Sequence, residues 1–131
     1  IGGQVMLLLV MLFLHIIDDF FIQGMCLSQL KQKAWWTKQP EYKELYKYDY
    51  LMALLMHSFS WTFMIMLPVA WKLNWNLSII FILIFIINLI VHFSIDNLKA
   101  NKGGINLIVD QFLHLIQIFL TYIIFIGGFM D

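Results

Sequence analysis

Four long apolar stretches alternate with polar segments along the chain. The stretches cover about residues 4–22, 50–71, 77–95 and 105–129. A helix of about 20 residues crosses the ~30 Å hydrocarbon layer of a bilayer, so each stretch is long enough to span a membrane. Asn88 is the only polar residue of the third stretch between Ile79 and Val91. This pattern predicts one all-α domain over residues 1–131, an integral membrane four-helix bundle.

The polar segments between the stretches differ in length and in charge. Residues 23–49 form a long, lysine-rich segment whose Trp35–Trp36 pair is typical of a membrane–water interface, and we expect it to be partly helical. Residues 72–76 predict a tight turn, and residues 97–104 predict a short loop that contains two glycines. Seven of the eight lysines lie in the first and third segments. The positive-inside rule therefore predicts that loops 23–49 and 97–104 are cytoplasmic and that both termini lie outside the inner membrane.

Composition excludes several classes of protein. The chain is 62% hydrophobic and only 12% charged, with a mean hydropathy of +0.83, whereas soluble domains carry about 25% charged residues. This excludes a soluble monomer. A net charge of zero makes a nucleic-acid-binding protein unexpected, and the single cysteine, Cys26, excludes an internal disulfide. The chain begins at Ile1 rather than at a methionine, which leaves open a longer natural N-terminus.

Ionisable residues inside the apolar stretches are the main functional signal. Each one costs at least ~2.5 kcal/mol within a membrane helix, yet four of the eight acids and all four histidines lie in or at the ends of the stretches. Three His/Asp pairs are spaced i, i+4, which places both side chains on one helical face and lets one helix offer two ligands to a metal ion. The predicted metal ligands are His15, Asp19, His57, His92, Asp96, Asp110 and His114.

In the predicted topology all these residues lie in the cytoplasmic half of the membrane, as expected for a metal site in the core of a bundle. Mixed histidine and carboxylate ligands favour one or two Zn²⁺ or Mn²⁺ ions over Mg²⁺ or Ca²⁺. Only one of the adjacent Asp18 and Asp19 is expected to point fully inward, and Asp18 is a candidate general base. Lys99 is a candidate group for neutralising a phosphate. Gln23 and Gln111 are candidate hydrogen-bond partners of the ligands.

The order of these motifs resembles an uncharacterised family of small bacterial and phage membrane proteins, known as a domain of unknown function. That family shows H-x-x-x-D-F-x-x-Q, an isolated His, H-x-x-x-D-x-x-K and D-Q-x-x-H. This chain carries the same motifs from His15, at His57, from His92 and from Asp110. The family is similar to membrane-bound metal-dependent hydrolases. The resemblance therefore implies an intramembrane metal site and a hydrolytic activity.

Three hypotheses of different classes follow. The first is a metal-dependent membrane hydrolase whose partners are the bilayer and a lipid headgroup or a small phosphoester. The second is a metal or proton transporter that uses the polar side chains inside the apolar stretches as its path. The outer halves of stretches two and three are nearly all apolar, which argues against it. The third is a non-catalytic, phage-type membrane interaction protein in which the His/Asp cluster only holds the helices together. Metal content separates the third hypothesis from the others.

Overall fold

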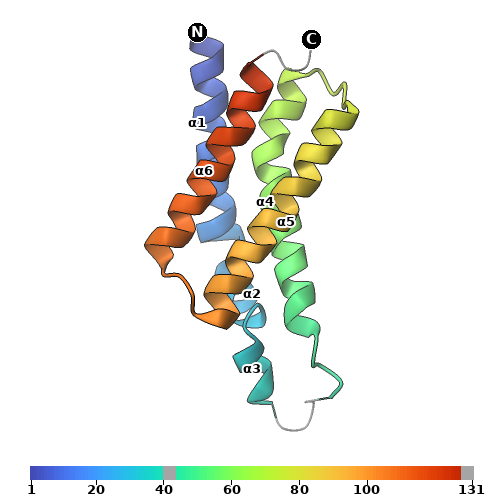
Figure 1. The fold of residues 1–131 in the computed structure, drawn as a ribbon, viewed down its shortest axis with the longest axis vertical. Helices are drawn as coiled ribbons and strands as arrows, with labels where there is room; N and C mark the ends of the chain where they lie inside the picture. The colour runs from blue at the N-terminus through green and yellow to red at the C-terminus, as the bar shows by residue number, and fades with distance from the viewer. Residues whose placement is uncertain (40–43, 128–131) are drawn as a thin grey trace.

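The computed structural model describes residues 1–39 and 44–127, and the regular secondary structure of this part of the chain is all helical. Four long helical segments pack as a bundle, and two short helices lie at one end of it (Figure 1). The predicted four-helix bundle with a partly helical first loop is therefore confirmed. The helices in chain order are α1 (Gly2–Ile16), the π-helix η1 (Ile17–Ile22), α2 (Gly24–Leu30), α3 (Lys33–Thr37), α4 (Asp49–Lys72), α5 (Ile79–Lys102) and α6 (Leu107–Ile126).

Four helical segments are long and apolar enough to cross a membrane. Their most apolar windows have mean hydropathies from 1.5 to 2.5, and no more than 44% of any such window is buried within the bundle. The outward faces carry large apolar side chains that are more than half exposed, as a lipid-covered surface requires. Examples from the four segments are Phe13, Met56, Ile87 and Phe112. The segments are Gly2–Ile22, Asp49–Lys72, Ile79–Asn101 and Leu107–Ile126.

The boundaries of α5 and α6 depend on capping residues. The Ser78 hydroxyl accepts a hydrogen bond from the backbone N–H of Phe81 at the start of α5, and Gly103, with φ +60°, ends that helix in the left-handed conformation. The predicted loop over residues 97–104 is thus wrong over residues 97–102, because the glycine and not the lysines ends the helix. Asn106 caps α6, which ends at Ile126. The predicted end of the fourth stretch, at residue 129, lies outside the described residues.

The first span changes its helical type near its end. In η1 the backbone N–H of Gln23 bonds to the carbonyl of Asp18 at 2.9 Å, five residues back, which is the wider π-helical pattern. Asp18 is fully buried, and the Asp19 side chain is only 8% exposed. The expectation that only one of these two neighbours points inward is therefore wrong, because it assumed a regular α-helix. Gly24, with φ +62°, then redirects the chain into α2.

The interior of the bundle has an apolar half and a polar half. The apolar half lies toward the N-terminus, the α4–α5 turn and the end of α6, which share one end of the bundle (Figure 1). The polar half lies toward α2 and contains the histidines and aspartates. Because this half brings ionisable side chains from all four spans together, it is the candidate functional site. The buried apolar cluster consists of Leu7, Met11, Trp61, Ile65, Met66, Val69, Ala70, Phe81, Ile118, Tyr122 and Phe125.

Candidate metal centre

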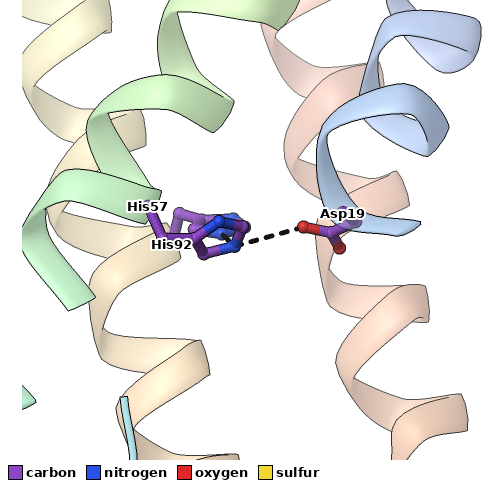
Figure 2. Close-up of side chains that lie close together, drawn as sticks. All are labelled: Asp19, His57 and His92. Atoms are coloured by element: carbon purple, nitrogen blue, oxygen red, sulfur yellow. Dashed lines mark hydrogen bonds and ion pairs between the residues drawn. The ribbon is translucent and has the colours of Figure 1, made fainter. Parts of the chain in front are cut away.

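Side chains from three different helices meet at the middle of the polar half. Figure 2 shows the imidazoles of His57 and His92, from α4 and α5, facing the carboxylate of Asp19 from η1. The Nε2 atom of His57 lies 3.2 Å from Nε2 of His92 and 3.3 Å from Oδ1 of Asp19. The three residues lie on separate helical segments whose other side chains are mostly apolar. Packing of these segments against one another brings the three polar side chains together.

Asp96 on α5 lies at the centre of the histidines. Its Oδ2 atom is 3.2 Å from Nε2 of His57, and its Oδ1 atom is 3.6 Å from Nε2 of His92 and 3.3 Å from Nε2 of His114. Asp110 continues the cluster on α6, where its Oδ1 atom lies 3.4 Å from Nε2 of His114. Three imidazole nitrogens, from α4, α5 and α6, thus face one buried carboxylate.

Three overlapping groups in the described residues have ligand atoms close enough to hold a metal ion. Within each group the ligand atoms lie within 4.8 Å of one another. Six of the seven predicted ligands belong to these groups, and His15 does not. The groups are Asp19, His57 and His92; then His92, Asp96 and His114; and then Asp19, Asp110 and His114.

The spacing of the donor atoms suits an ion better than a network of hydrogen bonds alone. The Oδ1 atoms of Asp19 and Asp110 are buried without a hydrogen-bond partner, although each lies 3.3 or 3.4 Å from an imidazole Nε2. Ligands at 2.0–2.1 Å from a tetrahedral Zn²⁺ lie about 3.3 Å from one another. The two facing Nε2 atoms of His57 and His92 can share at most one proton, whereas an ion could accept both lone pairs. The donor set and its spacing therefore fit a divalent ion.

The charges of the polar half are compatible with a bound divalent ion. Four carboxylates face two lysines: Lys31 lies 2.6 Å from Oδ2 of Asp96, and Lys99 lies 2.8 Å from Oδ2 of Asp110. With neutral histidines, four negative and two positive charges leave a net charge of −2. One divalent ion would cancel this charge, and so would two protons on histidines. The four carboxylates belong to Asp18, Asp19, Asp96 and Asp110.

Hydrogen bonds around the cluster hold its members in place. Asp18 accepts a hydrogen bond from the Ser60 hydroxyl at 2.5 Å, and its Oδ1 atom lies 3.6 Å from Nδ1 of His57. A carboxylate beside the far nitrogen of a histidine is the usual arrangement for a metal-binding imidazole. At 3.6 Å this contact is longer than a hydrogen bond, and a role of Asp18 in positioning His57 stays a proposal. Its role as a general base stays a prediction.

His15 occupies the edge of the cluster and has partners for both ring nitrogens. The indole N–H of Trp61 donates to Nδ1 of His15 at 2.8 Å, and Nε2 of His15 lies 3.1 Å from Oε1 of Gln111. The amide of Gln111 in turn donates to Asp19 at 2.9 Å and to Asp110 at 3.1 Å. His15 therefore links the cluster to Trp61, and its role as a metal ligand stays a prediction. Gln111 lies where a hydrogen-bond partner of the ligands was expected.

Comparison with known proteins places the chain in a family. Residues 7–129 match the family described as "Protein of unknown function (DUF3307)". The chain belongs to this family. No curated protein and no solved structure matches the chain. Because the description of DUF3307 names no activity, the functional argument for this member rests on the geometry of its own site.

Sequence patterns missed two buried residues of this DUF3307 site. Lys31 belongs to the lysine-rich segment 23–49 and was not among the candidate site residues, yet it is 6% exposed, bonds to Gln23 and forms the ion pair with Asp96. No periodicity could reveal this, because the left-handed Gly24 changes the direction of the chain before Lys31. Trp61 stacks on His92 with ring centroids 4.1 Å apart and is fully buried. Its position four residues after His57, on the same face of α4, was an available signal.

A layer of amides closes the site toward the apolar half. The Gln117 amide donates to the backbone carbonyl of Asn88 at 2.7 Å and to its side-chain oxygen at 2.9 Å. The Asn88 amide donates to the Thr121 hydroxyl at 2.9 Å. Asn88 lies one helical turn before His92 on α5, and Gln117 and Thr121 lie one and two turns after His114 on α6. Beyond this layer, the described part of the chain packs buried apolar residues such as Leu7, Val69, Phe81 and Phe125.

Proposed function

We propose that this chain binds one or two divalent metal ions in the polar half of its bundle and uses them to hydrolyse a phosphoester at the cytoplasmic face of the membrane. The observation that supports the proposal is the convergence of three imidazole Nε2 atoms on the carboxylate of Asp96, at 3.2, 3.3 and 3.6 Å. The ions that suit mixed histidine and carboxylate ligands are Zn²⁺ and Mn²⁺. When bound, such an ion supplies a nucleophilic water at neutral pH and polarises the ester.

The residues of the chain have separate tasks in this proposal. His57, His92, His114 and the carboxylates of the three groups hold the ions. Asp18 keeps His57 oriented through the contact at Nδ1. Lys99, whose side chain is 36% exposed, lies at the rim and can compensate the charge of a phosphate. Burial of the ligands among apolar helices strengthens each electrostatic contact, because little water screens it.

The proposed orientation places the site at the cytoplasmic end of the spans. Helices α2 and α3 lie at the same end of the bundle as the polar half (Figure 1). They belong to the lysine-rich segment that the positive-inside rule assigns to the cytoplasm. A substrate would therefore reach the site from the cytoplasm or from the inner leaflet. The layer of Asn88 and Gln117 and the core beyond it favour catalysis over transport, since in the described part of the chain that core is built of apolar side chains.

Metal content and hydrolysis test the proposal together. The protein is purified in mild detergent without chelator, and its metal is measured by mass spectrometry. We expect one or two equivalents of metal in the wild type and less than a tenth of an equivalent in His92→Ala. The matched control is Asn88→Ala, since Asn88 is equally buried one turn away on the same face of α5 but lies outside the metal-binding groups. This control should keep the wild-type metal content.

Hydrolysis is then measured with p-nitrophenyl phosphate and bis(p-nitrophenyl) phosphate. The wild type and Asn88→Ala should hydrolyse one of them, and chelator or His92→Ala should remove the activity. A wild-type protein without metal would contradict the whole proposal. A metal-loaded protein that hydrolyses neither ester would remove the hydrolase and leave the metal site.

A further inference from the structure

A small polar pocket lies beside the candidate metal centre, between α2 and the last turns of α5. Its volume is about 250 Å³, below the ~300 Å³ at which pockets for drug-sized ligands begin. It therefore suits a small polar group rather than a whole lipid or nucleotide. We call it the lysine pocket. Its lining residues are Gln23, Ser28, Lys31, Gln32, Asp96, Lys99 and Ala100.

The lysine pocket combines two cations with neutral hydrogen-bonding groups. Lys31 and Lys99 both line it, from opposite elements, and Gln23, Gln32 and Ser28 supply amide and hydroxyl groups. Such a set binds the oxygens of a phosphoryl group, because ammonium and amide N–H groups are donors. The carboxylate of Asp96 also lines the pocket and belongs to the candidate metal centre, so the two sites share a wall.

Both lysines are held by carboxylates of the metal centre. Lys31 pairs with Oδ2 of Asp96 at 2.6 Å, and Lys99 pairs with Oδ2 of Asp110 at 2.8 Å. Without an ion, these two carboxylates neutralise both ammonium groups, which leaves no free positive charge to attract an anion. Ions held by the group that contains Asp96 and by the group that contains Asp110 would compete for these carboxylates and weaken their hold on the lysines. The ammonium groups then become available to a second anionic partner.

From this geometry we propose that the lysine pocket holds the phosphoryl group of the substrate, and that it does so only when the metal centre is loaded. This proposal rests on the proposed function and specifies its substrate as a phosphomonoester or a phosphate-bearing headgroup. Because binding free energies are reciprocal, phosphate should also tighten metal binding by the same factor by which metal tightens phosphate binding. The lysines serve in turn as partners of the carboxylates and as partners of the phosphate.

Calorimetric titration with inorganic phosphate tests the proposal on the whole chain in detergent. We expect phosphate to bind the Mn²⁺-loaded wild type at least tenfold more tightly than the chelator-treated protein. Lys31→Met and Lys99→Met should each weaken phosphate binding at least tenfold while metal content is retained. Lys99→Met is included because Lys99 is partly exposed and so tolerates replacement better than the buried Lys31. Lys38→Met, at an exposed position of the same loop, is the matched control and should bind phosphate as the wild type does.

The outcomes are distinguishable from those of the proposed function. Phosphate that binds equally well to the wild type and to both lysine variants is held by the metal alone, and this result would overturn the lysine pocket but not the metal site. Phosphate that binds equally with and without metal would overturn it as well. A protein that takes up no metal removes the proposed function itself. Nanodiscs that contain phosphatidic acid, compared with phosphatidylcholine alone, assign the source: competition with inorganic phosphate indicates a lipid headgroup, and its absence indicates a soluble phosphomonoester.

Discussion

Removing the bound ion should lower the melting temperature of the wild-type protein in detergent. The perturbation is a chelator that strips the centre around Asp96 and leaves the fold otherwise unchanged. It exposes the net charge of −2 that four carboxylates and two lysines leave in the polar half. At about 2.5 kcal/mol per charge in a membrane helix, two uncompensated charges cost about 5 kcal/mol, a cost that proton uptake by the histidines reduces.

The expected size follows from binding linkage. An ion present at 100 times its Kd stabilises the folded state by about 2.7 kcal/mol, which is smaller than the cost of two uncompensated charges. For a chain of 131 residues, 1 kcal/mol corresponds to about 4 °C in Tm. The chelator should therefore lower Tm by about 10 °C. The effect should saturate with chelator concentration and reverse when Mn²⁺ or Zn²⁺ is added back.

Two variants separate the ion from ordinary packing. His92 is fully buried between Trp61 and His114, with ring centroids at 4.1 and 4.2 Å. His92→Ala should lose on the order of 1–2 kcal/mol of stability through the cavity, and chelator should then have no further effect. Asn88→Ala loses its hydrogen bonds to Thr121 and Gln117, which costs about 1 kcal/mol, but it should keep the full chelator shift.

The assay is thermal unfolding followed by circular dichroism or intrinsic fluorescence, for three proteins with and without chelator. If the cluster only holds helices together by hydrogen bonds, the chelator will leave all three melting temperatures unchanged. Equal melting temperatures of the wild type in the two conditions, in a protein shown to be folded, would refute the metal centre and the hydrolase with it.

Three further predictions concern topology, ligand positioning and a helix end. A cysteine introduced as Lys38→Cys, with Cys26 replaced by serine, should resist membrane-impermeant maleimide in intact cells, and rapid labelling would reverse the proposed orientation. Ser60→Ala removes the hydroxyl that donates to Asp18 at 2.5 Å, and it should weaken metal affinity about tenfold in a competition titration. Unchanged affinity would contradict a role of Ser60 and Asp18 in positioning the metal ligands. Gly103→Ala should cost about 1 kcal/mol of stability in thermal unfolding, because φ is +60° at this position. A Cβ would meet nothing within 4 Å at Gly103 or at Gly3, so the two sites differ in backbone conformation and not in space. Gly3→Ala, which has no positive φ, is the control and should cost nothing.

The sequence alone sufficed for the four long apolar helices and for the shared level of the ionisable residues along the bundle. Hydropathy is a local property that adds up along a helix, so the stretches around Ile79 or Leu107 predict membrane spans without any knowledge of their neighbours. The i, i+4 spacing of His92 and Asp96 likewise fixes one helical face by backbone geometry alone. These local rules also anticipated that Asp110 and His114 would lie at the same level as that pair. The structure brings all four into contact.

Only the tertiary structure decided which side chains meet. The π-helix turns both Asp18 and Asp19 inward, and Gly24 brings Lys31 against Asp96 across 65 positions of the chain. The rotation of α1 places His15 on Trp61 rather than among the groups that can hold a metal. Helix rotation, crossing and a single irregular turn each shift a side chain by several ångströms, which is more than the span of a coordination sphere. Such shifts depend on contacts between distant segments, and no periodicity within one helix records them.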